Sequence, residues 1–228
     1  QATAQGVWAD MSMAPGNPSP NYYASAPLVV NLMPAGGICT GDSVAPATKH
    51  LKEIMVIYTS ALGVPASFML LDYIAYYPFI DQSTTDEQIL SNTGFSLPRY
   101  ASGDGVQMMP VLVAPQSGAV ATEMVVKYND EETTRTTPIV RCNTTTANGG
   151  ILSSSAATAL SCGPFLPLDI DSTSRRVTKI ESVTMNVTDT GLFALVLVKP
   201  IASFTIRESS APVEVCFMKD LPSMPRIY

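Results

Sequence analysis

The stretch ASFMLLDYIAYYPFIDQSTTDEQILSNTGFSLPRY, residues 66–100, decides the fold that this sequence predicts. Its first part, residues 66–77, is an apolar run whose length fits either a buried strand or a helix. Tyr, Ile and Phe dominate the run, and these residue types favour a strand. We expect the strand to stop at Pro78, because proline cannot donate a hydrogen bond to a neighbouring strand.

A short helix is expected directly after this strand, over residues 81–92. Thr84 can cap its N-terminus, and Glu87, three residues later, completes a capping box. The negative charges of Asp86 and Glu87 suit the positive end of a helix. The helix should have about two turns.

The composition favours strands joined by turns. Only 14% of the 228 residues are charged, and the chain contains 14 glycines and 18 prolines, which break helices. A β-sandwich of this length is commonly one domain. The net charge of −6 disfavours binding to a phosphate backbone, so no nucleic-acid partner is expected. A membrane partner is not expected either, because a spanning helix needs about 20 apolar residues and the longest apolar run is shorter.

The domain organisation predicted is an extended Pro-rich arm over residues 1–27 and a single β-sandwich domain over residues 28–228. The prolines of the arm prevent regular strand pairing and favour an extended path. Trp8, Tyr22 and Tyr23 are the aromatic residues of the arm. They are candidate interface residues, because rigid aromatic side chains bury a large area at low entropic cost. The alternative is that they fold back onto the core of their own domain.

The rest of the chain reads as a series of strands. The runs 28–33 and 52–59 are expected to be covered on both faces, and the seven apolar residues 192–198 indicate a central strand buried on both faces. Met124, Val126 and Tyr128 alternate with Glu123, Val125 and Lys127 in a predicted hairpin. A slip in the alternation near Glu181 indicates a bulge. About ten strands at near-regular spacing predict an all-β protein with a jelly-roll-like sandwich. The other segments expected to form strands are 106–113, 133–141, 151–156, 179–187, 202–206 and 213–218.

The sequence offers no convincing catalytic group. His50 is the only histidine, and its position among lysines indicates a surface or structural residue. The serine-hydrolase elbow GxSxG, the P-loop and the GxGxxG motif do not occur. Glu131 and Glu132 lie in the predicted hairpin turn, where solvated charge explains them better than a pair of glycosidase carboxylates does. We therefore expect a non-enzymatic protein.

Metal and cofactor sites are not expected. Asp169 and Asp171 begin a stretch that resembles a calcium loop, but Ser174 stands at the position of the turn glycine and Ile180 at that of the bidentate glutamate. The cysteines are isolated in the sequence, and we expect free buried thiols in preference to any of the three possible disulfide pairings. These cysteines are Cys39, Cys142, Cys162 and Cys216.

Several segments resemble a family of virion structural proteins of tailed bacteriophages. The resemblance covers most of the chain after about residue 51, and its motifs are packing and turn segments without a catalytic signature. They include LLDYIAYYPFID (70–81), TDEQ (85–88), LPRY (97–100), GDGVQMMPVLV (103–113), CGPFLPL (162–168), IESVTM (180–185), GLFALVLVKP (191–200), APVEV (211–215) and MPRIY (224–228).

The resemblance implies a capsid decoration or cement protein with a jelly-roll-like fold. Its partners would be the major capsid protein and copies of itself, it would lie on the capsid surface of the virion after assembly in the host cytoplasm, and it would form a homo-oligomer. A receptor- or glycan-binding tail or fibre component with a β-sandwich head is the alternative. An enzyme such as a polysaccharide depolymerase and the main shell protein itself are weaker alternatives, because paired carboxylates and long helices are not evident.

Overall fold

The computed structural model describes residues 6–13, 23, 28–29, 53–57, 64–144, 147–154, 163–171 and 173–216. Within these residues the only helical element is the 3₁₀ turn η1 (Met11–Met13), and all other regular structure is β-strand. The predicted all-β class is therefore confirmed. The strands are β1 (Leu28–Val29), β2 (Glu53–Val56), β3 (Ala66–Asp81), β4 (Gln88–Ile89), β5 (Gln107–Ala114), β6 (Glu123–Asn129), β7 (Thr134–Thr136), β8 (Val140–Arg141), β9 (Lys179–Val187), β10 (Leu192–Ile206) and β11 (Val213–Cys216).

The chain divides into two compact units, and the long strands β3 and β10 each contribute residues to both. The division predicted from the sequence, an arm over 1–27 and one domain over 28–228, does not coincide with these units. Two of the three boundaries between the units fall inside strands, after Asp72 in β3 and after Val198 in β10. Unit 1 comprises Gln1–Cys39 and Tyr73–Val198, and unit 2 comprises Thr40–Asp72 and Lys199–Tyr228.

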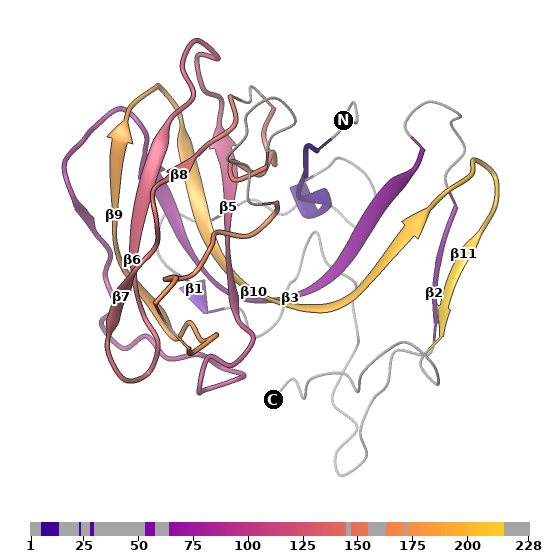
Figure 1. Ribbon diagram of the computed structural model, residues 1–228, viewed down its shortest axis with the longest axis horizontal. Helices are drawn as coiled ribbons and strands as arrows, with labels where there is room; N and C mark the ends of the chain where they lie inside the picture. The colour runs from indigo at the N-terminus through magenta and orange to yellow at the C-terminus, as the bar shows by residue number, and fades with distance from the viewer. Residues whose placement is uncertain are drawn as a thin grey trace. The chain divides into compact units, whose positions relative to one another are not determined.

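Unit 1 contains two antiparallel sheets around one core (Figure 1). One sheet has the strand order β1-β3-β10-β5, and the other has the order β4-β9-β6-β7, with β8 also paired to β6. Side chains from both sheets meet in the core, which makes unit 1 a β-sandwich. A jelly-roll connectivity stays a prediction. The core includes Tyr77 of β3, Leu112 of β5, Tyr128 of β6, Met185 of β9 and Leu195 of β10.

The part of β10 that belongs to unit 1 is buried on both faces, as predicted. Phe193 to Val198 are all fully buried, and β10 lies between β3 and β5. Phe193, Leu195 and Leu197 belong to the sandwich core, whereas Ala194 and the residues alternating with it face the other side of the sheet. The sheet therefore has apolar cover on its outer face as well. β10 continues to Ile206, so residues 202–206 are part of the same strand and not a separate one.

The predicted hairpin and bulge are also confirmed. Met124, Val126 and Tyr128 point into the core from β6, and the chain returns through β7 and β8. β9 pairs with β6 along its length, but Lys127 lies opposite Ser182 and Tyr128 lies opposite Ile180. Glu181 is therefore the extra residue of a bulge.

The prediction that Pro78 ends the first strand is wrong, because β3 continues to Asp81. The register of β1 along β3 covers Tyr76 and Ala75, so the missing N–H of Pro78 lies beyond that pairing. Phe79 follows with a φ of 55°, a conformation that bulky residues rarely adopt.

The helix predicted over residues 81–92 is not present. The Gln88 side chain accepts a hydrogen bond from the Asp81 N–H and donates one to the Asp81 carbonyl, each at 2.8 Å. Thr84 binds the Asp86 N–H, which forms a local turn without a following helix. Residues Gln88 and Ile89 then pair with β9 as the short strand β4. Side-chain bonds to the backbone thus replace the helical ones, a known competition for such residues.

Unit 2 contains the two-stranded sheet of β2 and β11, in which Val213 lies opposite Val56 and Cys216 opposite Glu53. It also contains the first part of β3 and the last part of β10, which lie side by side in Figure 1. The prediction that β2 is covered on both faces is wrong. Met55 of β2 and the following Ile57 are 55% and 54% exposed, and a two-stranded ribbon has no second sheet of its own to cover it.

Candidate functional site

The N-terminal segment, residues 6–13 (indigo in Figure 1), pairs with an edge of unit 1 through one antiparallel bridge. Residues 149–152 first pair with the edge strand β5: Leu112 N–H donates to the Gly150 carbonyl at 2.8 Å, and Leu152 N–H donates to the Pro110 carbonyl at 2.9 Å. We call residues 149–154 the edge segment. The N-terminal segment pairs in turn with this edge segment, with Ala9 opposite Gly150 in antiparallel orientation.

Three hydrogen bonds join the N-terminal segment to the edge segment. Asp10 N–H donates to the Gly149 carbonyl at 2.7 Å, and Ile151 N–H donates to the Trp8 carbonyl at 3.0 Å. Trp8 N–H donates to the Ser154 hydroxyl oxygen at 3.0 Å. The main chain of the segment therefore covers an edge that would otherwise present unpaired groups.

Asp10 anchors this segment in a buried polar position. Its carboxylate is 8% exposed and accepts hydrogen bonds from the Ser12 N–H at 2.9 Å and from the Tyr23 hydroxyl at 3.2 Å. The Tyr23 ring packs edge-on against Tyr76 of β3, with 4.9 Å between the ring centroids. A buried carboxylate is costly unless it is hydrogen-bonded, so these donors are what permits Asp10 at this position.

Tyr23 remains protonated and donates to the Asp10 carboxylate. Burial, followed by the charge of Asp10, raises the pKa of Tyr23 well above 10. Burial likewise raises the pKa of Tyr73, and Tyr23 and Asp10 add to the effect. A neutral hydroxyl can donate to the carboxylate, whereas a phenolate would repel it.

The three interface residues predicted from the sequence have different positions. Trp8 is half-buried and holds the edge segment through its main chain, and Tyr23 is buried against Tyr76. Tyr22 lies outside the described residues. Contact of these residues with a partner stays a prediction. Asp10 was not predicted from the sequence, because an isolated aspartate in a turn-rich stretch gives no pattern.

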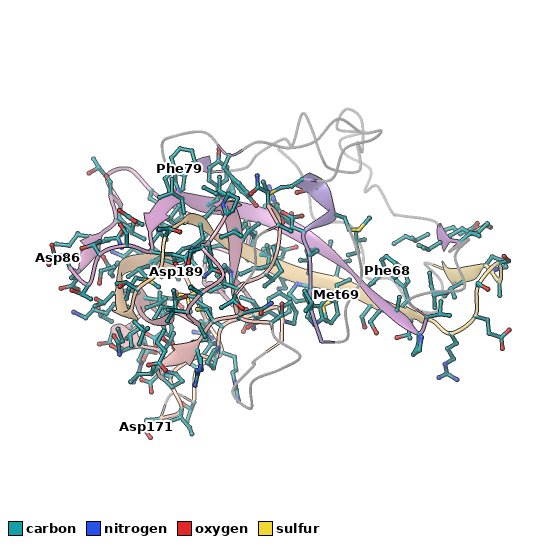
Figure 2. The ribbon with its side chains drawn as sticks, turned by 90° about the horizontal axis from the view of Figure 1, so that it is seen from above. Phe68, Met69, Phe79, Asp86, Asp171 and Asp189 are labelled. Carbon is teal, nitrogen blue, oxygen red and sulfur yellow. The ribbon has the colours of Figure 1, made fainter. Side chains whose placement is uncertain are left out.

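A second candidate surface lies in unit 2, on β3 and β10. The Phe68 and Phe204 rings stack with 5.7 Å between centroids and a 10° angle between planes, and the Ser67 and Thr205 hydroxyls lie 3.1 Å apart. Both phenylalanines are only half-buried, and Met69 is 37% exposed. Figure 2 shows Phe68 and Met69 on this part of β3. Consecutive residues of a strand face opposite sides, so Met69 lies on the face opposite to the stacked rings of Phe68 and Phe204. We call these two faces together, with Phe68, Met69 and Phe204, the ribbon surface.

The acidic motifs serve turns. Glu131 pairs with Arg176 at 3.0 Å, and the Glu132 N–H donates to the Asp130 carboxylate at 3.2 Å. The Asp171 N–H donates to the Asp169 carboxylate at 3.1 Å. Figure 2 shows Asp86, Asp171 and Asp189 at separate places in unit 1. Among the described residues there is no group of three or more His, Cys, Asp or Glu side chains that could hold a metal ion.

A buried polar cluster lies where β3 ends. The Gln116 amide nitrogen donates to the Gln82 side-chain oxygen at 2.8 Å, and the Thr122 hydroxyl donates to the same oxygen at 3.3 Å. The Gln82 main chain donates to the Gly191 carbonyl and accepts from the Asp189 N–H. These bonds connect the ends of β3, β5 and β9 and the start of β10, so we assign the cluster a structural role.

Cys142 is buried and not disulfide-bonded, as predicted, and its Sγ donates a hydrogen bond to the Val140 carbonyl oxygen at 3.8 Å. The side chains of the other cysteines lie outside the described part. His50 also lies outside it. No helix in the described residues has the length and apolar character needed to cross a membrane.

The fold and these surfaces define an all-β protein whose unit 1 is a sandwich. Comparisons with protein-family models, with curated proteins and with solved structures gave no match.

Proposed function

We propose that this protein is a non-enzymatic structural component of the virion of a tailed bacteriophage, a capsid decoration or cement protein that binds and stabilises the major capsid shell. The segments that resemble such proteins include the strands β3, β5, β9 and β10, which build the sandwich of unit 1. A sandwich of this kind is a rigid support for a binding surface.

The observation that carries the proposal is the exposure of apolar side chains in unit 2. Met69 of the ribbon surface is 37% exposed, and Met55 on β2 is 55% exposed. The stacked pair of Phe68 and Phe204 is only half-buried. Aromatic residues and methionine are enriched at protein–protein interfaces. The shell would cover these side chains in the assembled particle.

A binding experiment with particles tests this function. Capsids assembled without the protein are mixed with the purified chain, and the bound fraction is measured by sedimentation. We expect the wild type to bind and to raise the temperature at which the particles release DNA. Met69→Ser should weaken binding about tenfold, the effect of losing one well-buried interface side chain.

The matched control is Ile170→Ser, which removes an isolated apolar side chain that is 90% exposed in unit 1. Its binding should equal that of the wild type. Wild-type protein that stays in the supernatant at all concentrations would contradict the proposal.

A second candidate function is binding of a receptor or glycan by a tail or fibre component, and Phe79 favours it. Among the described side chains Phe79 is the only exposed aromatic one, at 37%, and its positive φ places a strained residue at the surface. Strained backbone often occurs at functional sites. A glycan array decides: hits that disappear in Phe79→Ser support this function, and an array without hits argues against it.

A further inference from the structure

We propose that the N-terminal segment (residues 6–13) is an exchangeable strand, which occupies the edge segment (residues 149–154) of a second copy of this chain and so links the copies. The following observations on unit 1 carry this inference. It concerns contact between copies and does not depend on the proposed capsid function.

The first observation is that the three hydrogen bonds between the N-terminal segment and the edge segment join residues far apart in the sequence. Trp8 and Ser154 are 146 positions apart, and the pairs Asp10–Gly149 and Trp8–Ile151 are of the same kind. Nothing in these three hydrogen bonds depends on both partners belonging to one chain. An identical element from a second copy would make the same bonds, which is the basis of domain swapping.

The second observation is that the position needs an occupant. Without the segment, the Ile151 N–H loses its acceptor, the Trp8 carbonyl, and the buried Tyr23 hydroxyl loses the Asp10 carboxylate. Unpaired polar groups at a sheet edge and in a buried position are unfavourable. Each copy therefore requires one segment, its own or that of another copy, and a closed dimer or ring meets this requirement for all copies.

The third observation is the sequence that connects the segment to Tyr23. It contains Pro15, Pro18 and Pro20 within nine residues. Prolines fix the backbone and favour extended connections, and such connections make it less favourable for a chain to turn back on itself. From the sequence of this connection we infer that delivery of the segment to a neighbouring copy is favoured.

The outer side of the N-terminal segment is a further candidate contact with a second copy. Ala9 is exposed, and its own N–H and carbonyl point away from Gly150, because the flanking residues Trp8 and Asp10 make the bonds to the edge segment. Met11 is exposed as well. The exposed side chains of Ala9 and Met11 therefore place apolar surface at the junction that an exchanged strand would create.

Cysteine cross-linking between differently tagged chains tests the exchange. Ala9 and Gly150 form a non-hydrogen-bonded antiparallel pair, whose short Cα separation accepts a disulfide. Chains carrying Ala9→Cys with one tag and Gly150→Cys with another are unfolded together, refolded and oxidised. We expect a covalent heterodimer that carries both tags, in at least tenfold excess over a control mixture of Ala9→Cys with the wild type, which reports reaction with native cysteines.

The double variant Ala9→Cys/Gly150→Cys measures whether the link forms within one chain. Should it form only an internal link while the mixture gives no heterodimer, the segment binds its own chain and the proposal is overturned. Wild-type protein that is monomeric by light scattering over the whole concentration range would overturn it too.

A second variant keeps the test independent of the folding of Gly150→Cys. Asp10→Ala removes the buried anchor but leaves the edge segment unchanged. Under exchange its molar mass in light scattering should fall toward that of the monomer, whereas a segment bound within its own chain would leave the mass unchanged. Neither readout involves particles, so a failure of capsid binding and a failure of exchange are distinguishable.

Discussion

The two halves of β3 and β10 make an instructive comparison, because the same pair of strands is buried in unit 1 and half-exposed in unit 2. In unit 1, Tyr77 and Leu195 are fully buried between two sheets. In unit 2, Phe68 and Phe204 carry side chains that are as apolar, yet both remain half-buried. β3 and β10 lie beside each other in both units, but the packing against their side chains differs.

The difference teaches that apolar character along a strand does not by itself determine burial. Burial requires a second layer, which the β9 and β6 sheet supplies to the core side of β10 in unit 1. Where the described residues of unit 2 lack such a layer, the apolar side chains are available to a partner. Three predictions test this difference between the two units.

The largest effect is expected for truncation in the buried half. Leu195→Ala should lower the free energy of unfolding by about 3 kcal/mol, because it leaves a cavity in a packed core. Phe204→Ala, in the half-buried part of the same strand, should cost about 1 kcal/mol, since less apolar surface leaves contact with the protein. Urea unfolding followed by circular dichroism measures both. Equal losses of unfolding free energy in the two variants would contradict the difference in burial between the two halves of β10.

A smaller effect on the free energy of unfolding is expected for the buried carboxylate of Asp130, in the turn between β6 and β7 of unit 1. The Asp130 carboxylate accepts hydrogen bonds from Arg135 Nε at 2.8 Å and from the Thr133 N–H at 2.9 Å. Burial raises the pKa of Asp130, but these bonds outweigh it, and the net pKa lies below the ordinary value. Asp130→Asn should lower the unfolding free energy at pH 7 by about 1.5 kcal/mol, the value of a hydrogen bond to a charged group.

The pH dependence follows from the direction of this shift. The folded chain binds the Asp130 proton less readily than the unfolded chain, so the stabilisation is complete above the ordinary aspartate pKa, about 4, and is lost as the pH falls below it. Asp130→Asn should therefore flatten the decline of stability in acid. The exposed Asp86→Asn is the control, with a change under about 0.5 kcal/mol at pH 7. An unchanged acid slope in Asp130→Asn would contradict the lowered pKa of Asp130 in the folded chain.

The fold of unit 1 was predictable where core-facing residues alternate with outward-facing residues along a strand. The alternation of Met124, Val126 and Tyr128 and the slip at Glu181 are local properties of the sequence, and the structure has both. The helix over residues 81–92 was predicted wrongly because Gln88 binds the backbone of Asp81, a contact between residues seven positions apart that a capping pattern does not contain.

The candidate surfaces were less predictable, because they depend on contacts between distant segments. Asp10 is buried only because Tyr23 and the edge segment meet it there, and its neighbours in the sequence contain no sign of this. The exposure of Met55 could not be predicted from β2 either. An apolar run on both faces of a strand looks the same whether a second sheet covers it or a partner does.

The smallest effect is expected for the pair Phe68 and Phe204, and it tests whether unit 2 has a defined structure before any partner binds. Stacked rings contribute about 1 kcal/mol beyond the area that they bury. A double-mutant cycle with Phe68→Leu, Phe204→Leu and the double variant isolates this coupling, because leucine retains apolar bulk and removes the ring contact.

The matched cycle uses Ser67→Ala and Thr205→Ala, whose hydroxyls meet on an exposed part of the same strands and should couple by less than about 0.5 kcal/mol. Phenylalanine coupling near zero, with intact unit 1, would mean that the rings meet only in the presence of a partner, and the contrast between the two halves of β3 and β10 would then be one between a folded sandwich and a surface that forms on binding.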